Sequence, residues 1–348
     1  MSPPLVSVLV PAFNASATLD ATLRSARGQT HAELEIIVVD DGSTDATVEI
    51  ATRHAAADPR VRILCQPNGG VARARNHGLA VAEGAFIAPL DSDDVWHPEK
   101  IARQLAAIEA AGSGCALAYN WFRRIDPQDR LLGASARPTI AGYALYRHID
   151  WNFISNGSTP LVRTAAAREV GGYDPALRDA GVQGCEDYLF QLRLARRHEF
   201  ACVPAFLTGY RVMPGAMSSG AARMIQSHLM AYSLLRGEVD RAAARLIDRK
   251  IAAMRMALLR NRLRRGAVFD GAAQLIRAFA RHPAGAIDGL QTEWRRLAAS
   301  RLTDPGSAPG AAFDTLAPEQ VDGAWRTARS DAWLRRLTLL DEAAALSR

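Results

Sequence analysis

The first 120 residues alternate between short apolar runs and amphipathic stretches, and this alternation restricts the possible folds more than any other feature. Apolar runs of strand length lie at residues 5–10, 34–39, 61–65, 85–90 and 115–119. The intervening periodicity predicts helices at about 16–27, 44–57, 69–82 and 98–111. Strands that are apolar throughout are typical of parallel sheets buried on both faces. We therefore predict an α/β fold in which βαβ units build a mostly parallel, Rossmann-like sheet flanked by helices.

The rest of the chain has a different pattern. Residues 140–217 mix loops with a helix-like stretch at 186–197 and a strand-like stretch at 201–210. From about residue 218 the chain is rich in Ala, Leu and Arg and almost wholly helical in pattern, with a Gly/Pro/Ser-rich break at 303–310. We predict one domain over residues 1–217, with halves of about 1–120 and 121–217. A C-terminal helical extension then covers 218–348.

Composition narrows the class of protein. The chain has 348 residues, of which 49% are hydrophobic and 22% charged, as in globular proteins. Its four cysteines are scattered without a C-x-x-C pair, which favours reduced thiols over a disulfide framework or a zinc site. No apolar segment approaches the roughly 20 residues of a membrane span, and the N-terminus lacks the basic region of a signal peptide. A cytoplasmic protein is expected, and its net charge of +6 favours anionic partners.

Two acidic clusters follow predicted strands, where ligands bind in sheets of this type. Asp91 and Asp93 stand two residues apart, a spacing that lets both carboxylates address one Mg²⁺ or Mn²⁺ ion together with substrate phosphate oxygens. A solvated loop, with Asp94 capping the next helix, explains the same residues without a ligand. Helix capping explains only part of the other cluster, because it leaves the adjacent Asp40 and Asp41 unaccounted for. A carboxylate there can accept a hydrogen bond from a uracil N3–H or a ribose hydroxyl.

Seven segments together resemble the family 2 glycosyltransferases, which have the GT-A fold. They occur in that family's order over roughly residues 5–215: VSVLVPAFN, SARGQT, LEIIVVDDGSTD, GGVARARNHGL, DSDD followed by W-x-P, VGGYDP and GCEDYLFQLRLARR. The resemblance implies a catalytic domain over 1–217, whose first half binds a nucleotide and whose second half binds an acceptor.

The resemblance also implies a donor site. Phe13 would stack near the base, Asp41 would bind the uracil of a UDP-sugar, and Asp93 would contact the metal that bridges the diphosphate, with Asp91 near the ribose or the ion. Arg73 and Arg75 could add positive charge at the phosphates, although exposed helix-face arginines remain an equal alternative for each. The complete nucleotide-binding set is Pro11, Phe13, Asn14, Asp40, Asp41, Arg73, Arg75 and Asp91, with Asp93 and Asp91 as metal ligands.

The Glu186-Asp187 pair opens a predicted helix, and acids there also stabilise a helix dipole. In the resembling family the acid at this place is the catalytic base, which we assign to Asp187, with Glu186 as second choice. Such a base takes the proton of an acceptor hydroxyl in a displacement that inverts the sugar's anomeric configuration.

The acceptor pocket is assigned through the VGGYDP motif and neighbouring aromatic residues. Gly172 and Tyr173 belong to the motif, and Trp151, like Trp121, is a candidate sugar-stacking platform. For each tryptophan, a place in the core or at its rim is the favoured alternative.

Two features separate this chain from the family pattern. Many relatives have Y-R-x-H after the strand that follows the acidic helix, but Met213 occupies the place of that histidine, and thioethers bind hard cations poorly. Residues 241–265 also form a basic amphipathic stretch, which suits either an anionic membrane surface or a helix packed on the core with a solvated arginine face. Packing is the favoured reading, and no recognition motif supports nucleic-acid binding.

We predict an inverting, metal-dependent hexosyl- or N-acetylhexosaminyltransferase that uses Mn²⁺ or Mg²⁺ and a nucleotide-diphospho-sugar, with UDP as the expected nucleotide. Its acceptor would be a glycan or lipid-linked hydroxyl in polysaccharide or glycolipid synthesis, with peripheral contact at the inner membrane face if 241–265 binds lipid. Met213 and the helical extension also suit a non-catalytic relative that binds sugar nucleotides within an assembly complex. A nucleotidyltransferase is the third reading, but its phosphate-binding signature is absent near the N-terminus.

Overall fold

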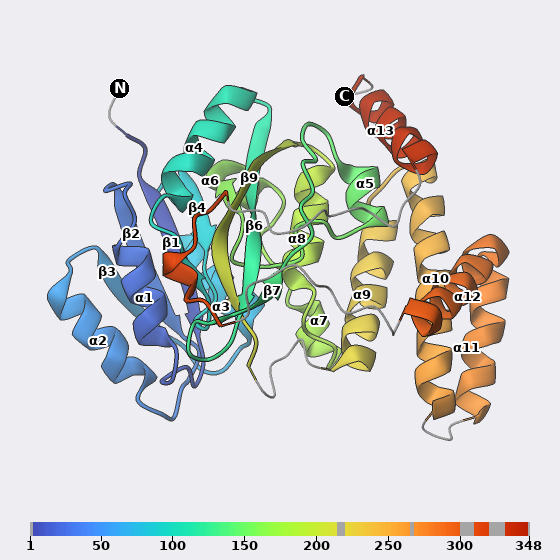
Figure 1. Ribbon diagram of the computed structural model, residues 1–348, viewed down its shortest axis with the longest axis horizontal. Coiled ribbons are helices and arrows are strands. Elements are labelled where there is room, and N and C mark those ends of the chain that lie inside the picture. Colours follow the sequence, from blue (N-terminus) through green and yellow to red (C-terminus); the bar gives the residue numbers. More distant parts are fainter. Residues whose placement is uncertain (1–2, 214–219, 265–267, 300–309, 320–330, 347–348) are drawn as a thin grey trace.

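A nine-stranded sheet forms the centre of the computed structural model, which describes residues 3–213, 220–264, 268–299, 310–319 and 331–346. The strand order is β3-β2-β1-β4-β8-β6-β9-β5, with β7 paired to β6 (Figure 1). The strands are β1 (Val6–Ala12), β2 (Leu34–Asp40), β3 (Val61–Cys65), β4 (Phe86–Pro89), β5 (Val95–Trp96), β6 (Cys115–Ile125), β7 (Leu131–Ala134), β8 (Leu161–Arg163) and β9 (Glu199–Arg211).

The first half of the sheet matches the predicted βαβ pattern. Strands β3, β2, β1 and β4 are parallel neighbours. Leu9 and Ile37 pack with α3 on one face, while Val8 and Ile36 pack with α1 and α2 on the other, so β1 and β2 are buried on both sides. The helices here are α1 (Leu19–Arg27), α2 (Thr47–Ala57), α3 (Val71–Val81) and α4 (Lys100–Ala111).

The second half of the sheet is more mixed than predicted. Strand β8 runs antiparallel to both β4 and β6, β5 runs antiparallel to β9, and β6 and β9 are parallel to each other. Apolar patterning does not encode strand direction, and β5 and β8 have only two and three residues, too few for a periodic signal. The helices of this half are α5 (Leu145–Asp150), α6 (Thr164–Glu169), α7 (Ala176–Asp179) and α8 (Glu186–Ala195).

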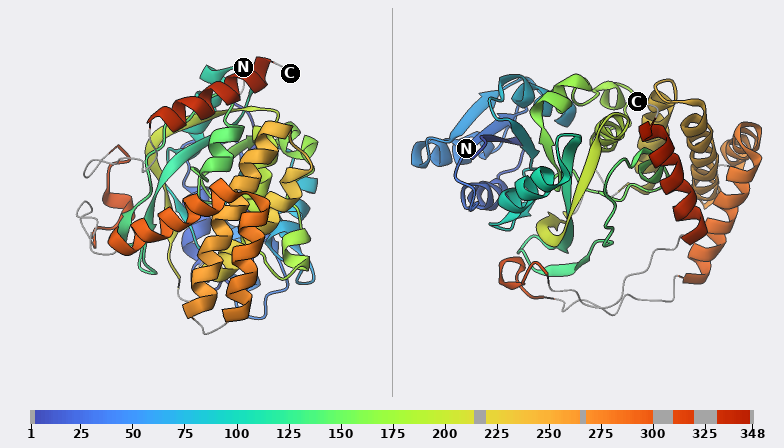
Figure 2. Two further views of the ribbon diagram at one scale, coloured as in Figure 1. Left: turned by 90° about the vertical axis from the view of Figure 1, so that its right-hand side faces the viewer. Right: turned by 90° about the horizontal axis from the view of Figure 1, so that it is seen from above.

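The C-terminal helices stand at the side of the sheet, beyond α8 (Figure 1), and α10, α11 and α12 make up the face turned to the viewer in the left panel of Figure 2. The basic stretch at 241–265 lies mostly in α10, whose Ile247, Ile251 and Met256 are buried, as the packing alternative expects. The helices here are α9 (Ala221–Arg236), α10 (Arg241–Arg264), α11 (Val268–Arg281), α12 (Pro283–Ala299) and α13 (Asp331–Leu346), whereas the 3₁₀ helix η2 (Phe313–Thr315) lies apart from them, on the side of β1 and α1 (Figure 1).

The last pieces of the chain fold back onto the sheet domain. Phe313 packs with Val95 and Ile125, and α13 packs on α5, where the Tyr146 backbone N–H donates to Asp341 at 2.7 Å. The predicted break at 303–310 falls almost entirely outside the described residues. The division at 217/218 therefore remains a prediction, and contacts between α13 and α5 cross it. No helix among the described residues is long and apolar enough to cross a membrane.

Candidate active site

The loops after β1 and β2 are tied together where the two strands end level, with Ala12 opposite Asp40. The Asn14 backbone N–H donates to Ser43 Oγ at 2.9 Å, and the Thr44 N–H donates to Asn14 Oδ1 at 2.8 Å. Asn14 has φ of +48°, a left-handed conformation that asparagine tolerates better than most residues. The Phe13 ring is 51% exposed beside this junction, whereas Pro11 is buried within β1. An exposed ring at a strand end can stack on a flat base.

Asp40 and Asp41 are both buried and have different structural tasks. The Asp40 carboxylate accepts hydrogen bonds from the backbone N–H groups of Gly42 and Ser43, which closes its own turn. The Asp41 carboxylate accepts the N–H groups of Gly69 and Gly70, each at 2.7 Å, and so fixes the turn that enters α3. The predicted contact between Asp41 and a base would add to these bonds, and it stays a prediction.

Asp94 explains why three acids crowd the loop after β4. Its carboxylate accepts Ser158 Oγ–H at 2.6 Å and the Arg211 backbone N–H at 2.9 Å, which holds the loop to the end of β9. Burial, and then the charges of Asp93 and Asp91, raise the pKa of Asp94 well above its usual range. The alternative in which Asp94 caps the next helix is wrong, because α4 begins only at Lys100.

The carboxylates of Asp91 and Asp93 differ in their partners. Asp91 accepts a charged hydrogen bond from Arg75 at 2.5 Å. Burial, followed by the charge of Asp91, raises the pKa of Asp93 to about 6. A positive ion beside both oxygens would relieve that repulsion, and carboxylate oxygens are the ligands that Mg²⁺ and Mn²⁺ prefer. These two residues therefore fit a divalent cation. Within the described part of the chain, no group of three or more His, Cys, Asp or Glu is arranged as a metal site, so substrate oxygens and water would complete the coordination.

Arg75 is the centre of the site, a position that the sequence did not reveal. Its side chain is only 2% exposed, and its two terminal nitrogens bind Asp91 at 2.5 Å and Glu186 at 3.0 Å. The guanidinium also lies over the Tyr173 ring, 5.1 Å from the ring centre. Although burial opposes it, the two carboxylates raise the pKa of Arg75. Arg75 thus links the D-x-D loop to the acidic start of α8.

Arg73, the other predicted phosphate contact, has a separate environment. It is on the exposed side of α3 and forms a two-bonded ion pair with Asp179 of α7, at 2.9 and 3.0 Å. This agrees with the alternative of an exposed helix-face arginine. In this conformation the Arg73 guanidinium is therefore engaged by Asp179 of α7.

Gly157 lies where the predicted donor and base residues meet. A Cβ atom built on Gly157 would lie 2.9 Å from Arg75 Nη2, 3.1 Å from Asp91 Oδ2 and 3.5 Å from Asp187 Oδ2. Three charged groups from α3, the β4 loop and α8 therefore surround one backbone position. Any larger residue would push them apart, but a lone glycine in a loop carries no sequence signal for such a role.

The two acids at the start of α8 are not equivalent. Glu186 is buried, paired with Arg75, and accepts the Gly184 N–H at 3.2 Å. Asp187 is partly exposed, and burial followed by the charge of Glu186 raises its pKa to about 7. A carboxylate with such a pKa exchanges protons near neutrality, which suits a general base.

The aromatic residues predicted for the acceptor pocket are mostly packed. Tyr173 is 2% exposed and stacks on Phe190 with ring centres 4.3 Å apart, and the Arg75 guanidinium packs on the Tyr173 ring. Trp121 is buried and donates to the Pro138 carbonyl at 2.8 Å, as the core alternative expects. Trp151 is partly buried against Phe153. Their contact with an acceptor remains a prediction.

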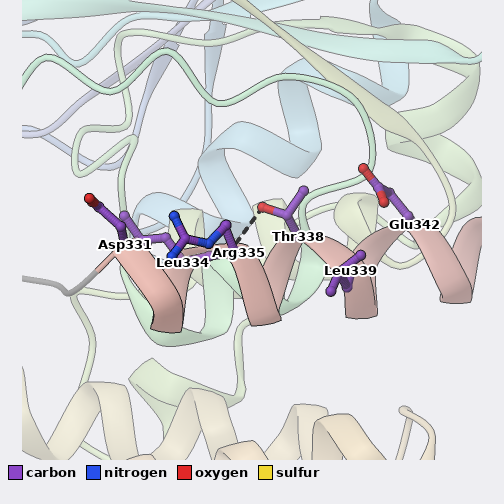
Figure 3. Close-up of a pocket in the computed structure, with 6 residues that line it drawn as sticks. All are labelled: Asp331, Leu334, Arg335, Thr338, Leu339 and Glu342. Atoms are coloured by element: carbon purple, nitrogen blue, oxygen red, sulfur yellow. Dashed lines mark hydrogen bonds between the residues drawn. The ribbon is translucent and has the colours of Figure 1, made fainter.

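Two hollows lie outside this cluster. One, of about 460 Å³, runs along α13 and is lined by residues of that helix alone (Figure 3). The other, of about 370 Å³, includes Asn76 and Gly172. Gly172 has φ of +68°, and a Cβ there would lie 2.5 Å from Asn76 Oδ1, so this turn of the VGGYDP motif requires glycine.

Met213, which stands in the place of the family's histidine, is the last residue described before 214–219 and lies two residues beyond the buried Arg211.

Comparison with known proteins gives a consistent picture. Residues 7–160 match the profile described as glycosyl transferase family 2. A chondroitin synthase of Pasteurella multocida (strain Pm70) is 36% identical over 129 residues, which are 37% of this chain and 13% of that protein. An Escherichia coli chondroitin synthase is 38% identical over 129 residues, 37% of this chain and 19% of that protein. The chain thus spans less than a fifth of the length of these two relatives.

Solved structures show the same fold. Residues 1–349 of S. aureus TarS in complex with UDP-GlcNAc align with a TM-score of 0.59 at 20% identity, over 86% of this chain and 93% of that one. The mannosyltransferase PcManGT of Pyrobaculum calidifontis, in complex with GDP-Man and Mn²⁺, aligns with a TM-score of 0.57 at 19% identity, over 86% and 82%. At these identities the likeness concerns the fold alone, which is GT-A with C-terminal helices as predicted.

Proposed function

We propose that the protein transfers a glycosyl group from a nucleotide-diphospho-sugar to an acceptor hydroxyl, a proposal supported by the match of residues 7–160 to the profile described as glycosyl transferase family 2. The observation that carries the proposal is the carboxylate cluster around Arg75 and Gly157, where the D-x-D loop meets Asp187. The D-x-D carboxylates could hold a cation beside the donor diphosphate, and Asp187 faces the same place, where a general base could take the proton of the attacking acceptor hydroxyl.

The donor would lie along the ends of β1, β2 and β4. Phe13 offers an exposed ring for the base, and the acids after β2 and β4 would then lie beside the ribose and the diphosphate. UDP is the proposed nucleotide, because the family resemblance implies a contact between Asp41 and uracil and a solved structure with this fold holds UDP-GlcNAc. Other bases stay open to test, since PcManGT, with the same fold, is in complex with GDP-Man.

Asp93, with Asp91, would hold Mn²⁺ or Mg²⁺. When bound, such an ion supplies positive charge that stabilises a nucleoside diphosphate as leaving group. The chain's own contribution is to keep these two carboxylates oriented: Arg75 fixes Asp91, and the Asp94 bonds to Ser158 and Arg211 hold the loop.

Asp187 would act as the base. Its carboxylate takes the acceptor hydroxyl proton while the hydroxyl oxygen forms a bond to the anomeric carbon. The bond from that carbon to the diphosphate oxygen breaks, and the nucleoside diphosphate departs with its electron pair. Attack opposite the leaving group inverts the anomeric configuration. Glu186 is less suited because its carboxylate is engaged with Arg75 at 3.0 Å.

The proposed acceptor is a growing polysaccharide or glycolipid, reached through the half of the domain that contains Trp151. The proposed domain division is a catalytic unit over 1–217 and a helical extension over 218–348. The transferred sugar, hexosyl or N-acetylhexosaminyl, would be selected by loops in the second half.

A thermal-shift series with nucleotide diphosphates and their sugars, each with and without Mn²⁺, would identify the donor, because a ligand that binds the folded state raises its melting temperature. Donor hydrolysis and transfer to a mixed glycan acceptor pool are then measured for wild type, Asp187→Asn and the exposed control Asp179→Asn.

Asp187→Asn should keep donor affinity but lose roughly 10²- to 10⁴-fold in turnover, as expected for removal of a general base, while the control stays near wild type. Full activity in Asp187→Asn would move the base elsewhere, first to Glu186. Donor binding by a wild type that never turns over would instead favour the non-catalytic, assembly-type relative.

A further inference from the structure

Helix α11 carries large apolar side chains on the side that faces away from its packing partner. Gly271 and Ala278 are buried, and Gly271 lies against Leu263 of α10. On the opposite side, Phe269 is 94% exposed and Ile276 is 69% exposed. Seven residues correspond to almost two helical turns, so these two side chains share one outer face. A surface helix of a soluble protein normally places polar residues there.

The neighbouring helix extends this surface. Helix α12 packs its small residues onto α10, since a Cβ on Gly289 would lie 2.6 Å from the Ala253 carbonyl oxygen, and Ile287 and Leu290 remain exposed. Seven of the eleven large hydrophobic side chains exposed among the described residues lie between 263 and 290, so the exposure is concentrated. We define the outer patch as Phe269, Leu275, Ile276, Phe279, Ile287 and Leu290.

The segment of the chain that carries the outer patch is strongly positive. Residues 241–290 contain eleven Arg and Lys against three Asp, an excess of eight positive charges, whereas the whole chain has a net charge of +6. Three arginines of α10 and α11 lie near one another: Arg255 donates to Gln274 of α11 at 3.0 Å, and burial, followed by the charges of Arg277 and Arg281, lowers the pKa of Arg255. Such a group gains from a nearby anion.

We propose that the outer patch, with the arginines beside it, binds the surface of an anionic lipid bilayer. Apolar side chains of a helix lying in the interface enter the acyl boundary, while neighbouring arginines meet anionic headgroups. Helix α10, singled out by the basic sequence pattern, supports this contact from beneath because its own apolar side is buried.

A second copy of the chain is a poorer occupant for the same surface. Two copies related by a two-fold axis would place identical patches against each other. The excess positive charge of each copy would then repel that of its partner, whereas anionic lipid neutralises it.

Co-sedimentation of the full chain with lipid vesicles tests the proposal. One set of vesicles contains phosphatidylcholine only, and the other also contains phosphatidylglycerol. Wild type should partition onto the anionic vesicles, and added salt should release much of it, because salt screens exposed charges. The variant Phe269→Ser/Ile276→Ser should partition roughly tenfold less or weaker still, since it removes two apolar side chains from the contact. Arg277→Gln should reduce binding to anionic vesicles selectively.

Leu339→Ser is the matched control, because Leu339 is 64% exposed on α13, outside the outer patch. Melting temperatures of all variants establish that they fold. The proposal is overturned if folded wild type ignores anionic vesicles or if Phe269→Ser/Ile276→Ser binds them as wild type does. It is also overturned if the outer patch instead drives self-association, seen as a wild-type dimer that becomes a monomer in the double variant without any vesicle binding.

Discussion

Replacing Asp187 with asparagine should make the folded protein more stable while removing its proposed base. Burial and the charge of Glu186 raise the pKa of Asp187 from 3.8 to about 7, so ionising this carboxyl in the folded state is costly. Since each tenfold change in acidity corresponds to about 1.4 kcal/mol, a pKa raised this far sets an upper limit of ~4 kcal/mol on the gain in stability. Because Asp187 is partly exposed and its neighbours can relax, we expect ~1–2 kcal/mol.

The pH dependence of the stability follows from the direction of this shift. Below about pH 4 the carboxyl is protonated in both the folded and the unfolded chain, and asparagine should then match wild type. Between pH 4 and pH 7 the unfolded chain has lost the proton that the folded chain still holds, so wild-type stability declines as the pH rises. The advantage of Asp187→Asn should therefore grow over this range and level off above pH 7.

Urea unfolding of both proteins at a series of pH values measures this difference. Asparagine keeps an oxygen that can accept the Tyr188 N–H, which Asp187 binds at 2.7 Å, so little packing is lost. Asp45→Asn is the control of opposite sign. Although burial works against it, hydrogen bonds from Ser16 and Thr47 lower the pKa of Asp45 to about 2, so that variant should lose stability at neutral pH. The reasoning is refuted if Asp187→Asn is less stable than wild type at pH 8, or if its advantage is independent of pH.

Three further predictions concern the same cluster. With the proposed base titrating near pH 7, kcat/KM should rise about tenfold per pH unit below pH 7 and level off above it; a flat profile from pH 5 to 8 would exclude Asp187. Gly157→Ala should lower turnover roughly tenfold or more, because its Cβ would displace Arg75 and Asp91. The control Gly237→Ala has open space around its Cβ and should keep wild-type turnover. Equal turnover in the two variants would contradict the idea that the space around Gly157 is too small for a side chain. Arg75→Met should lower the free energy of unfolding by ~3–5 kcal/mol, because it leaves buried carboxylates unpaired. In urea unfolding, the double variant with Glu186→Gln should recover part of this loss. If the effects of the two substitutions simply add, Arg75 and Glu186 are not coupled.

The sequence predicted the first half of the fold well because the signals there are strong. The regular alternation of short, largely apolar strands with amphipathic helices predicts βαβ units and hence parallel neighbours, and β3 begins and ends where the pattern placed it. The acids after β2 and β4 were placed at strand ends by the same logic. The second half of the sheet was predicted less well because its sequence signals are weak. Strand β8 has only three residues, and its antiparallel direction depends on pairing with β4 and β6.

The site was only partly predictable because its central contacts join distant parts of the chain. The sequence offered Arg75 as a phosphate contact or an exposed helix-face arginine, but its burial between Asp91 and Glu186 follows from the tertiary fold. Gly157 gives no periodic or compositional signal at all. The sequence suggested only a local capping role for Asp94, as an alternative without a ligand, whereas its partners, Ser158 and Arg211, lie far along the chain.

The roles of the site residues remain proposals, and one titration tests them most directly. The account holds that Asp91 and Asp93 await a cation and the diphosphate of a nucleotide. Calorimetric titration of UDP should therefore show binding that strengthens with Mn²⁺ in wild type and in the control Asp45→Ala, but no such strengthening in Asp93→Ala. Equal UDP affinity in wild type with and without Mn²⁺, or an unchanged Mn²⁺ effect in Asp93→Ala, would contradict the account.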